Sequence, residues 1–295
     1  MATDGVKIID GDDAHDNYWG IMDLYDSEVE LKKIEKEYPL KEIDFYDDFE
    51  NEIHVTSIGL AYWEIGLMNE KKLQLIQEVI ERGAGIEEWS DYSEKEGKAR
   101  AAVLKRFLKK ISSPNTKIRK IKKYRLIKNF HFYENDVLAF KAKNSTYRVV
   151  ICAKIEQYRG HCSYYFVPTS YENLEKPTID ILKKKTIIGH QIGSVCSREE
   201  TRKTQPGIEK IWEYIGGVNN FTFGLVIKAI DHKNLFTIKD NFTKIGSLKI
   251  KASLKKVGSI GYESSFENFQ ERFENIADFI TIFKYQKYPI KIVCE

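Results

Sequence analysis

Residues 137–158, VLAFKA-KNS-TYRVVICAKIEQY, decide the fold class of the second half of the chain. Two runs rich in β-branched and aromatic residues flank the segment Lys143-Asn144-Ser145, whose composition is typical of a turn. This pattern predicts a β-hairpin. Similar composition predicts further strands at 163–171, 221–230, 235–238, 248–252 and 288–293.

One long helix is predicted inside this β-rich region. Ser264-x-x-Glu267 has the pattern of a capping box, and apolar residues follow it at helical spacing as far as Phe283. We therefore expect residues 130–295 to form a β-rich domain, either a bent sheet or a small barrel, with a C-terminal helix near 266–285 that covers it.

Helix signals dominate the chain before Pro114. Five helices are predicted, in this order: one at 14–25 capped by Asp12 or Asp13, a short one opened by Ser27-x-x-Glu30, a buried one at 48–68, one from Asn69 to Gly83, and one opened by Ser93-x-x-Glu96. The sequence thus predicts an α+β protein with an acidic helical domain at 1–114, a basic linker at 115–129 and the β-rich domain at 130–295.

The composition excludes a disordered chain and leaves the charge unevenly distributed. Of 295 residues 42% are hydrophobic, enough to close a core, and the net charge is only +3. Residues 1–54 carry 17 acids and five lysines, whereas 101–130 carry 11 bases and no acid. Such an asymmetry predicts where partners dock. The four cysteines include no CxxC pair, which predicts reduced thiols. The sequence has no recognisable signal peptide and no apolar run long enough to span a bilayer. We therefore expect a cytoplasmic protein without a membrane partner.

Two acidic clusters are candidate metal sites. Asp12-Asp13-Ala14-His15-Asp16 and the acids around His54 both contain residue types that ligate metals. Acids in the first turn of a helix also compensate the helix dipole, which explains both clusters without a metal. We therefore expect no metal and no cofactor.

The chain also lacks a recognisable catalytic motif. Neither a GxSxG elbow, an HExxH pair, a P-loop nor a Rossmann glycine pattern occurs, and His161 and Cys162 would lie on opposite faces of a strand. Glu64 lies in an apolar run, where burial would raise its pKa, but a carboxylate that reaches solvent or a nearby base is the more common outcome. The prediction is that the protein is not an enzyme, with a hydrolase using Glu64 and His54 as the alternative.

The basic run from Lys105 to Lys128 allows a second alternative, a regulator that binds nucleic acid. Its first four cations fall in the last turns of a predicted helix, where positive charge is favoured anyway, and the neighbouring acidic domain would repel phosphate. Contact with that domain or with a partner protein is the preferred interpretation.

Short motifs resemble two bacterial families. The start of the first helix, with Asp12-Asp13-Ala14, is similar to unknown-function family 4259, although Gly11 stands where that family has a polar side chain. Three segments of the second half resemble the immunity protein 26 family: Glu134–Phe140, Thr146–Val150, and Phe236–Ile238 with Ile245–Leu248. In the first of these, Asn135 stands where glycine is usual.

The resemblance implies a cytosolic immunity protein, which binds a secreted bacterial toxin stoichiometrically and blocks its active site. The toxin would be a nuclease or another enzyme with a basic cleft, for which an acidic surface is complementary. The residues predicted to contact it are Asp12, Asp13, Asp16, Asp23, Asp26, Asp47, Asp48 and Glu50. Nucleic acid is the less favoured partner.

Overall fold

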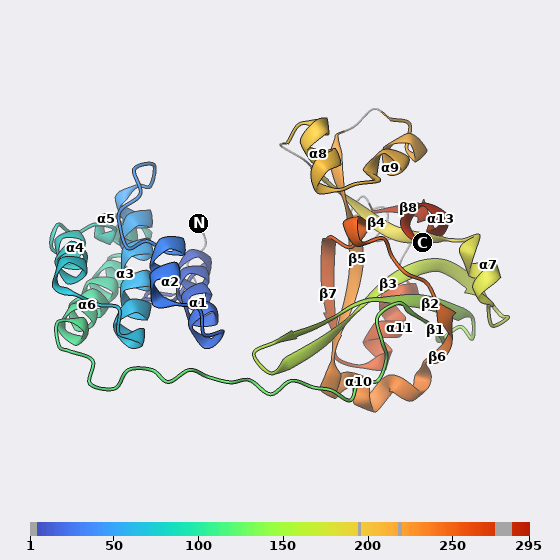
Figure 1. Cartoon of the computed structure of the whole chain (residues 1–295), viewed down its shortest axis with the longest axis horizontal. Helices are drawn as coiled ribbons and strands as arrows, with labels where there is room; N and C mark the ends of the chain where they lie inside the picture. Colours follow the sequence, from blue (N-terminus) through green and yellow to red (C-terminus); the bar gives the residue numbers. More distant parts are fainter. Residues whose placement is uncertain (1–4, 194–195, 218–219, 275–284) are drawn as a thin grey trace. The chain divides into compact units, whose positions relative to one another are not determined.

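A computed structural model of the chain describes residues 5–193, 196–217, 220–274 and 285–295. The fold is α+β, as predicted, and it divides into two compact units, Met1–Lys123 and Tyr124–Glu295. In Figure 1 the helical unit is coloured blue to green, and the unit built on the sheet is coloured green to red.

The helical unit is organised around one central helix, α3 (Asp48–Ile65). The other helices are α1 (Asp12–Asp26), α2 (Leu31–Glu37), α4 (Glu70–Glu81), α5 (Ile86–Tyr92) and α6 (Glu94–Ile111). Helix α3 is buried nearly all round because its apolar residues are not confined to one stripe. A capping box of Asp47 and Glu50 begins it, and Gly66 ends it in the left-handed conformation.

Two of the predicted helix caps are wrong. Helix α1 begins after Gly11, which has φ 89° and provides no side-chain cap, so Asp12 and Asp13 lie inside the first turn instead. Ser27 ends α1, and α2 begins after Glu30. The Asn69 cap of α4 and the Ser93 cap of α6 are confirmed.

The second unit contains a mixed sheet of eight strands. They are β1 (Asp136–Lys141), β2 (Tyr147–Tyr158), β3 (His161–Asn173), β4 (Thr186–Gly193), β5 (Phe221–Asp231), β6 (Thr243–Ser247), β7 (Val257–Glu263) and β8 (Tyr285–Pro289). Their order is β6-β1-β2-β3-β4-β5-β7, with β8 beside β4 and an additional β3–β5 pairing. All pairings are antiparallel except β5 with β7.

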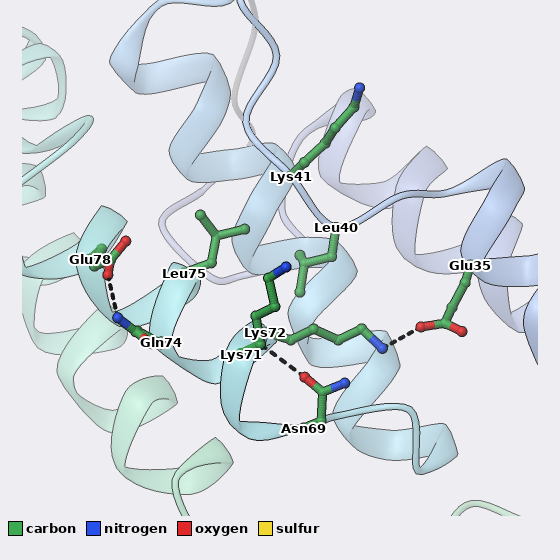
Figure 2. Close-up of a pocket in the computed structure, with 9 residues that line it drawn as sticks. All are labelled: Glu35, Leu40, Lys41, Asn69, Lys71, Lys72, Gln74, Leu75 and Glu78. Carbon is green, nitrogen blue, oxygen red and sulfur yellow. Dashed lines mark hydrogen bonds and ion pairs between the residues drawn. The ribbon is translucent and has the colours of Figure 1, made fainter.

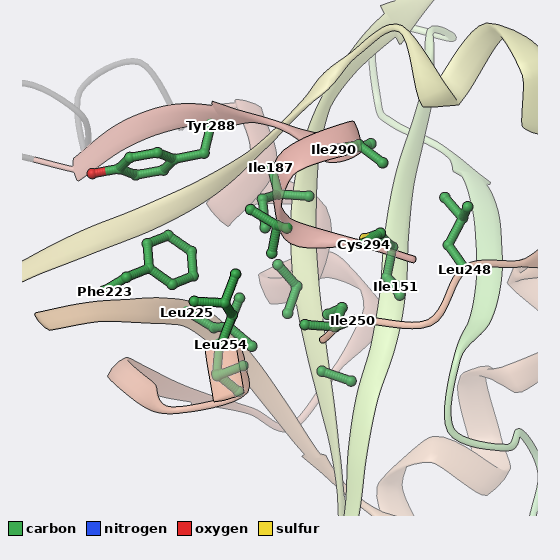
Figure 3. Close-up of a cluster of buried hydrophobic side chains, with 14 of the residues drawn as sticks. Ile151, Ile187, Phe223, Leu225, Leu248, Ile250, Leu254, Tyr288, Ile290 and Cys294 are labelled. Carbon is green, nitrogen blue, oxygen red and sulfur yellow. The ribbon is translucent and has the colours of Figure 1, made fainter. Parts of the chain in front are cut away.

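Over most of β1, β3 and β5 both faces of the sheet are buried, which explains the nearly continuous apolar runs of these strands. On β1, Val137 and Ala139 enter one hydrophobic cluster, while Leu138 and Phe140 enter another. Figure 3 shows the first cluster, where Phe223 of β5 packs edge-on against Tyr288 of the C-terminal segment, with ring centres 5.0 Å apart. Helices α7 (Ile179–Lys183), α9 (Ile208–Tyr214) and α13 (Ile290–Val293) supply residues to this cluster.

Three predicted strands differ from the structure. Residues 235–238 belong to helix α10 (His232–Ile238), and 248–252 are not a strand, although Ile250 forms an isolated bridge with Cys294. The predicted strand at 288–293 is strand only to Pro289 and then becomes α13. These segments are rich in β-branched residues, but their apolar side chains close the edges of the two clusters instead of extending the sheet.

The predicted C-terminal helix begins where expected. Helix α11 covers Phe266–Glu274, and Ser265, not Ser264, accepts a hydrogen bond from the Asn268 backbone N–H at 3.2 Å. The predicted continuation through 275–284 lies outside the described residues, and Tyr285 begins β8. Helix α8 (Arg198–Thr204) was not predicted, nor were α5, α7 and α9.

Candidate functional site

The acidic surface of α1 is formed by residues opposite the helix's buried face. Asp12, Asp13 and Asp16 are exposed, whereas Ala14 and Tyr18 point into the helical unit. Asp12 and Asp13 make no ion pair within the described residues, and Asp16 lies 4.0 Å from the exposed His15. Together with the half-buried Asp23, which lies seven residues after Asp16 and so on the same side of the helix, they form a surface that we call the α1 acidic face.

Asp26, also predicted as a contact residue, is instead engaged inside the unit. Its side chain is only 6% exposed, and both of its oxygens accept hydrogen bonds from the Arg119 guanidinium, at 2.6 and 2.7 Å. The Tyr25 hydroxyl donates to the Arg119 carbonyl at 2.7 Å, and the Arg119 N–H donates to the Glu64 carbonyl at 2.8 Å. These contacts hold the part of the basic linker around Arg119 against α1 and α3.

The acids at the start of α3 also have structural roles. Asp47 and Glu50 form the capping box described above. Asp48 lies 3.1 Å from Arg82, whose guanidinium also donates two hydrogen bonds of 2.7 Å to Glu42. The hydrogen bond from Arg82 lowers the pKa of Glu42. Three of the eight predicted contact residues therefore stabilise α3 or link it to α4.

Cations of the basic run are matched with acids of the helical unit. Besides Arg119, Lys110 lies 3.7 Å from Glu64, and Lys123 lies 3.5 Å from Glu28. The Glu64 side chain is 25% exposed and accepts a hydrogen bond of 2.7 Å from the Tyr18 hydroxyl. Glu64 is therefore tied to a tyrosine and a base, the ordinary alternative to a catalytic carboxylate.

His54 does not join Glu64 in a cleft. Its Nδ1 lies 3.4 Å from the Asn17 amide nitrogen, and its ring packs edge-on against Tyr46. Burial lowers the pKa of the His54 imidazole, which keeps the ring neutral at physiological pH. The two residues bond to different side chains of α1, so their contacts do not assemble the catalytic pair considered from the sequence.

Sequence reasoning missed a buried ion pair between Glu52 and Arg100. The exposed fractions of their side chains are 0% and 1%, and the two are joined by hydrogen bonds of 2.5 and 3.1 Å. Arg100 also donates to the carbonyls of Val6 and Lys7. A signal was present, because Arg100 occupies the first position of the apolar stripe that continues through Leu104, Phe107 and Ile111.

The helical unit has a pocket of about 550 Å³ between α2 and α4, shown in Figure 2. Lys72 extends from α4 to Glu35 of α2, with which it forms an ion pair, and it also donates to the Leu67 carbonyl at 2.8 Å. Lys41 and Lys71 add positive charge, whereas Glu78 is hydrogen-bonded to Gln74. The pocket thus contains both positive and negative side chains, and the ammonium of Lys72 is already paired with Glu35, which links α4 to α2.

A second polar cavity, of about 420 Å³, lies on the sheet unit where β2, β3, β5 and β7 meet. It is lined by Glu156, Gln157, Tyr158, His161, Ser163, Tyr165, Asp231 and Tyr262. The Ser163 hydroxyl donates to Asp231 at 2.8 Å, and the Tyr165 hydroxyl donates to Glu156. Burial and the neighbouring Glu156 raise the pKa of Tyr165, so the phenol stays protonated.

The rings of His131 and His232 stack on each other, and His232 directly follows β5. The rings of His131 and His232 lie 4.2 Å apart at an angle of 15°. The Tyr164 hydroxyl accepts from the His131 backbone N–H and bonds to His232 Nδ1, both at 3.0 Å. Burial lowers the pKa of each imidazole, and the proximity of His232 lowers that of His131 further.

Within the described ranges, no group of three or more His, Cys, Asp or Glu side chains converges closely enough to hold a metal ion. None of the helices described is both long and apolar enough to span a bilayer. All four cysteines are free thiols, and burial raises the pKa of Cys294 to about 11.

Comparisons with known proteins give no relative from which a function could be transferred. No protein-family model, no curated protein and no solved structure matches this chain.

Proposed function

We propose that this protein is an immunity protein that binds a toxin stoichiometrically and thereby neutralises it. The proposal rests first on the resemblance of the second half to the immunity protein 26 family. Its supporting observation is that three of the segments that resemble this family, Glu134–Phe140, Thr146–Val150 and Ile245–Leu248, contribute to adjacent strands of one sheet, whereas Phe236–Ile238 lies in α10. Strand β1 pairs with β2 on one side and with β6 on the other. The Leu248 N–H and the Ser247 hydroxyl both donate to the Asn135 carbonyl, at 2.9 and 3.1 Å.

Asn135 adds a conformational argument. It has φ 74°, in the left-handed region that glycine adopts most easily and that asparagine tolerates better than other side chains. The residue that departs from the usual glycine of the resembled motif therefore keeps the backbone geometry that a glycine would provide.

The proposed contact surface is the α1 acidic face, with Asp12, Asp13, Asp16 and Asp23. Asp26, Asp47, Asp48 and Glu50 bond to other groups of the helical unit, so their charges contribute less to a complementary field. Like charges on one helix face repel one another, and a basic toxin surface would relieve that repulsion and accelerate association. The same face disfavours the alternative of nucleic-acid binding, because phosphate would be repelled.

The decisive experiment is co-purification from the native host, followed by mass spectrometry of any protein recovered in equal amount. The double variant Asp16→Lys/Asp23→Lys is expected to recover less of the partner and to associate with it more slowly, with an unchanged melting temperature. Glu81→Lys/Asp91→Lys is the matched control, since it changes the net charge equally at exposed positions of α4 and α5.

Recovery of nucleic acid instead of a stoichiometric protein would favour the regulator. Partner binding that is equal in both double variants would exclude the α1 acidic face as the contact, and a melting temperature lowered only by Asp16→Lys/Asp23→Lys would assign these acids to the fold.

A further inference from the structure

The polar cavity of the sheet unit has a regular construction that its sequence does not reveal. Glu156 on β2 pairs in register with Ser163 on β3, which in turn pairs with Asp231 on β5. Residues that pair across antiparallel strands project to the same face of a sheet. Two carboxylates therefore flank one hydroxyl in a row across three strands, at the floor of the cavity.

Aromatic rings border this row. One step along the strands, Tyr165 pairs with Ala229, which pairs with Tyr262 of β7. On the other side of the row, Tyr158 pairs with His161 near the end of the hairpin. Tyr262 is 66% exposed and Tyr158 is 52% exposed, so both rings are accessible from solvent.

The charge of the cavity favours a cation. Its lining contains two carboxylates and neither lysine nor arginine. Lys154 and Tyr165 already donate to the two oxygens of Glu156, so Asp231 is the carboxylate with an oxygen left for a ligand. Hydrogen bonds from Lys154 and Tyr165 lower the pKa of Glu156, which keeps this carboxyl ionised. Asp231 accepts the Ser163 hydroxyl through Oδ1. Within the described residues its Oδ2 has no hydrogen bond, so it can receive a donor from a ligand.

The chain itself contains an example of a cation bound by a tyrosine ring and a carboxylate. Lys154 lies just outside the cavity, with its ammonium 5.6 Å from the centre of the Tyr165 ring and 2.5 Å from Glu156. Tyrosine faces and carboxylates at this spacing bind cations by complementary electrostatics. A planar guanidinium fits better than a second ammonium, because it can stack on an exposed tyrosine while two of its N–H groups reach carboxylate oxygens.

We propose that this cavity binds an arginine side chain of a protein partner. The inference rests on the proposed function, to which it adds a second contact, in the sheet unit, for the same toxin. It identifies the chemistry of that contact as a guanidinium that donates to Asp231, stacks on Tyr262 and lies beside the charge of Glu156.

The test is an NMR titration of the full-length, ¹⁵N-labelled chain with N-acetyl-arginine amide. N-acetyl-citrulline amide is the neutral ligand of nearly the same shape. The expected result is a set of saturable shifts at the cavity residues with an affinity on the order of millimolar, and no saturable shifts with the citrulline compound. Equal binding of both ligands, or no saturable shift with the arginine compound, would overturn the proposal.

Variants locate the site. Asp231→Asn keeps an oxygen that can accept the Ser163 hydroxyl but removes the charge, so the arginine affinity should fall by about tenfold. Asp180→Asn removes the same charge from an exposed position of α7 and should leave the affinity unchanged. If Asp231→Asn perturbs the fold, Glu156→Gln tests the second carboxylate. A cavity variant that folds and binds like the unaltered chain would contradict the inference.

These outcomes are independent of those for the proposed function, because the small probe needs no toxin. If the arginine compound binds but no partner is co-purified, the cavity stands and the immunity function fails. If a partner is recovered equally by Asp231→Asn and by the unaltered chain, the immunity function stands and the cavity is excluded from the interface.

Discussion

Arg100 has the most consequential set of contacts of any single residue in the helical unit. It neutralises the buried Glu52, stacks on Trp89 at 5.5 Å from the ring centre and holds the carbonyls of Val6 and Lys7. Burial raises the pKa of Glu52 and the Arg100 charge opposes that effect. The pair is therefore balanced only while both partners are present.

We predict that Arg100→Met lowers the free energy of unfolding by about 3–5 kcal/mol, because it leaves a carboxylate buried without a partner. The double variant Glu52→Gln/Arg100→Met should recover a large part of that loss. Urea denaturation followed by circular dichroism measures both. A double variant as unstable as Arg100→Met would show that packing, not charge, dominates at this site.

The stacked histidines predict a dependence of stability on pH. Because the folded state lowers both pKa values, the unfolded chain binds more protons than the folded chain once the pH falls below about 6.5. The free energy of unfolding should therefore fall as the pH decreases through that range, and His131→Gln should reduce the slope. Urea midpoints at several pH values test this. Phe236→Leu, which removes a ring contact but no titrating group, is the control, and an identical slope in His131→Gln would contradict the prediction.

At the scale of elements, β5 and β7 depend on two facing glycines. A Cβ added to Gly224 would lie 2.3 Å from the Gly258 Cα, and the clash is with backbone that no rotamer change can move. We predict that Gly224→Ala destabilises the sheet unit by about 1–3 kcal/mol. Gly193→Ala on β4 has open space around it and should be nearly neutral. Thermal melts of the two variants, if indistinguishable, would contradict the close approach.

Long elements could be predicted from sequence, whereas several short ones, such as α5, α7 and α8, could not. Helices α3 and α4 and the β1–β2 hairpin were predicted because several turns or alternations repeat the same signal. Residues 235–238 have the composition of a strand but form the end of α10, since Leu235 and Ile238 are needed to close a cluster built by distant strands. Local composition contains no information about that requirement.

In the candidate site, too, some features could be predicted from the sequence and others could not. The exposure of Asp16 follows from helical periodicity alone, because its position is opposite the buried Ala14 and Tyr18. The engagement of Asp26 depends on Arg119, 93 residues later. The arginine cavity depends on the register of four strands, whose lining residues Glu156 and Tyr262 lie 106 residues apart in the chain. Only the tertiary fold determines such pairings.

At the scale of the whole molecule, the boundary of the helical unit lies beyond the predicted one. Residues 115–123 were assigned to a linker, but Arg119 and Lys123 bond to residues of the helical unit, which extends to Lys123. We predict that a fragment ending at 123 is more stable than one ending at 114 by about 1–3 kcal/mol, the contribution of a largely buried charged hydrogen-bond network. Far-UV circular dichroism during urea denaturation compares the two fragments. Equal midpoints would show that these contacts contribute no stability.

The position of β1 between β2 and β6 has a consequence for synthesis of the protein on the ribosome. Strand β2 follows β1 at once, but β6 begins only at Thr243, about 100 residues after β1 has been made. At typical elongation rates that interval lasts roughly 5–20 s. During that time the nascent chain has one edge of an apolar strand without its partner, whereas the helical unit is already complete. Newly made chains should therefore recruit chaperones over this interval, and a pause in translation before Thr243 would prolong their exposure.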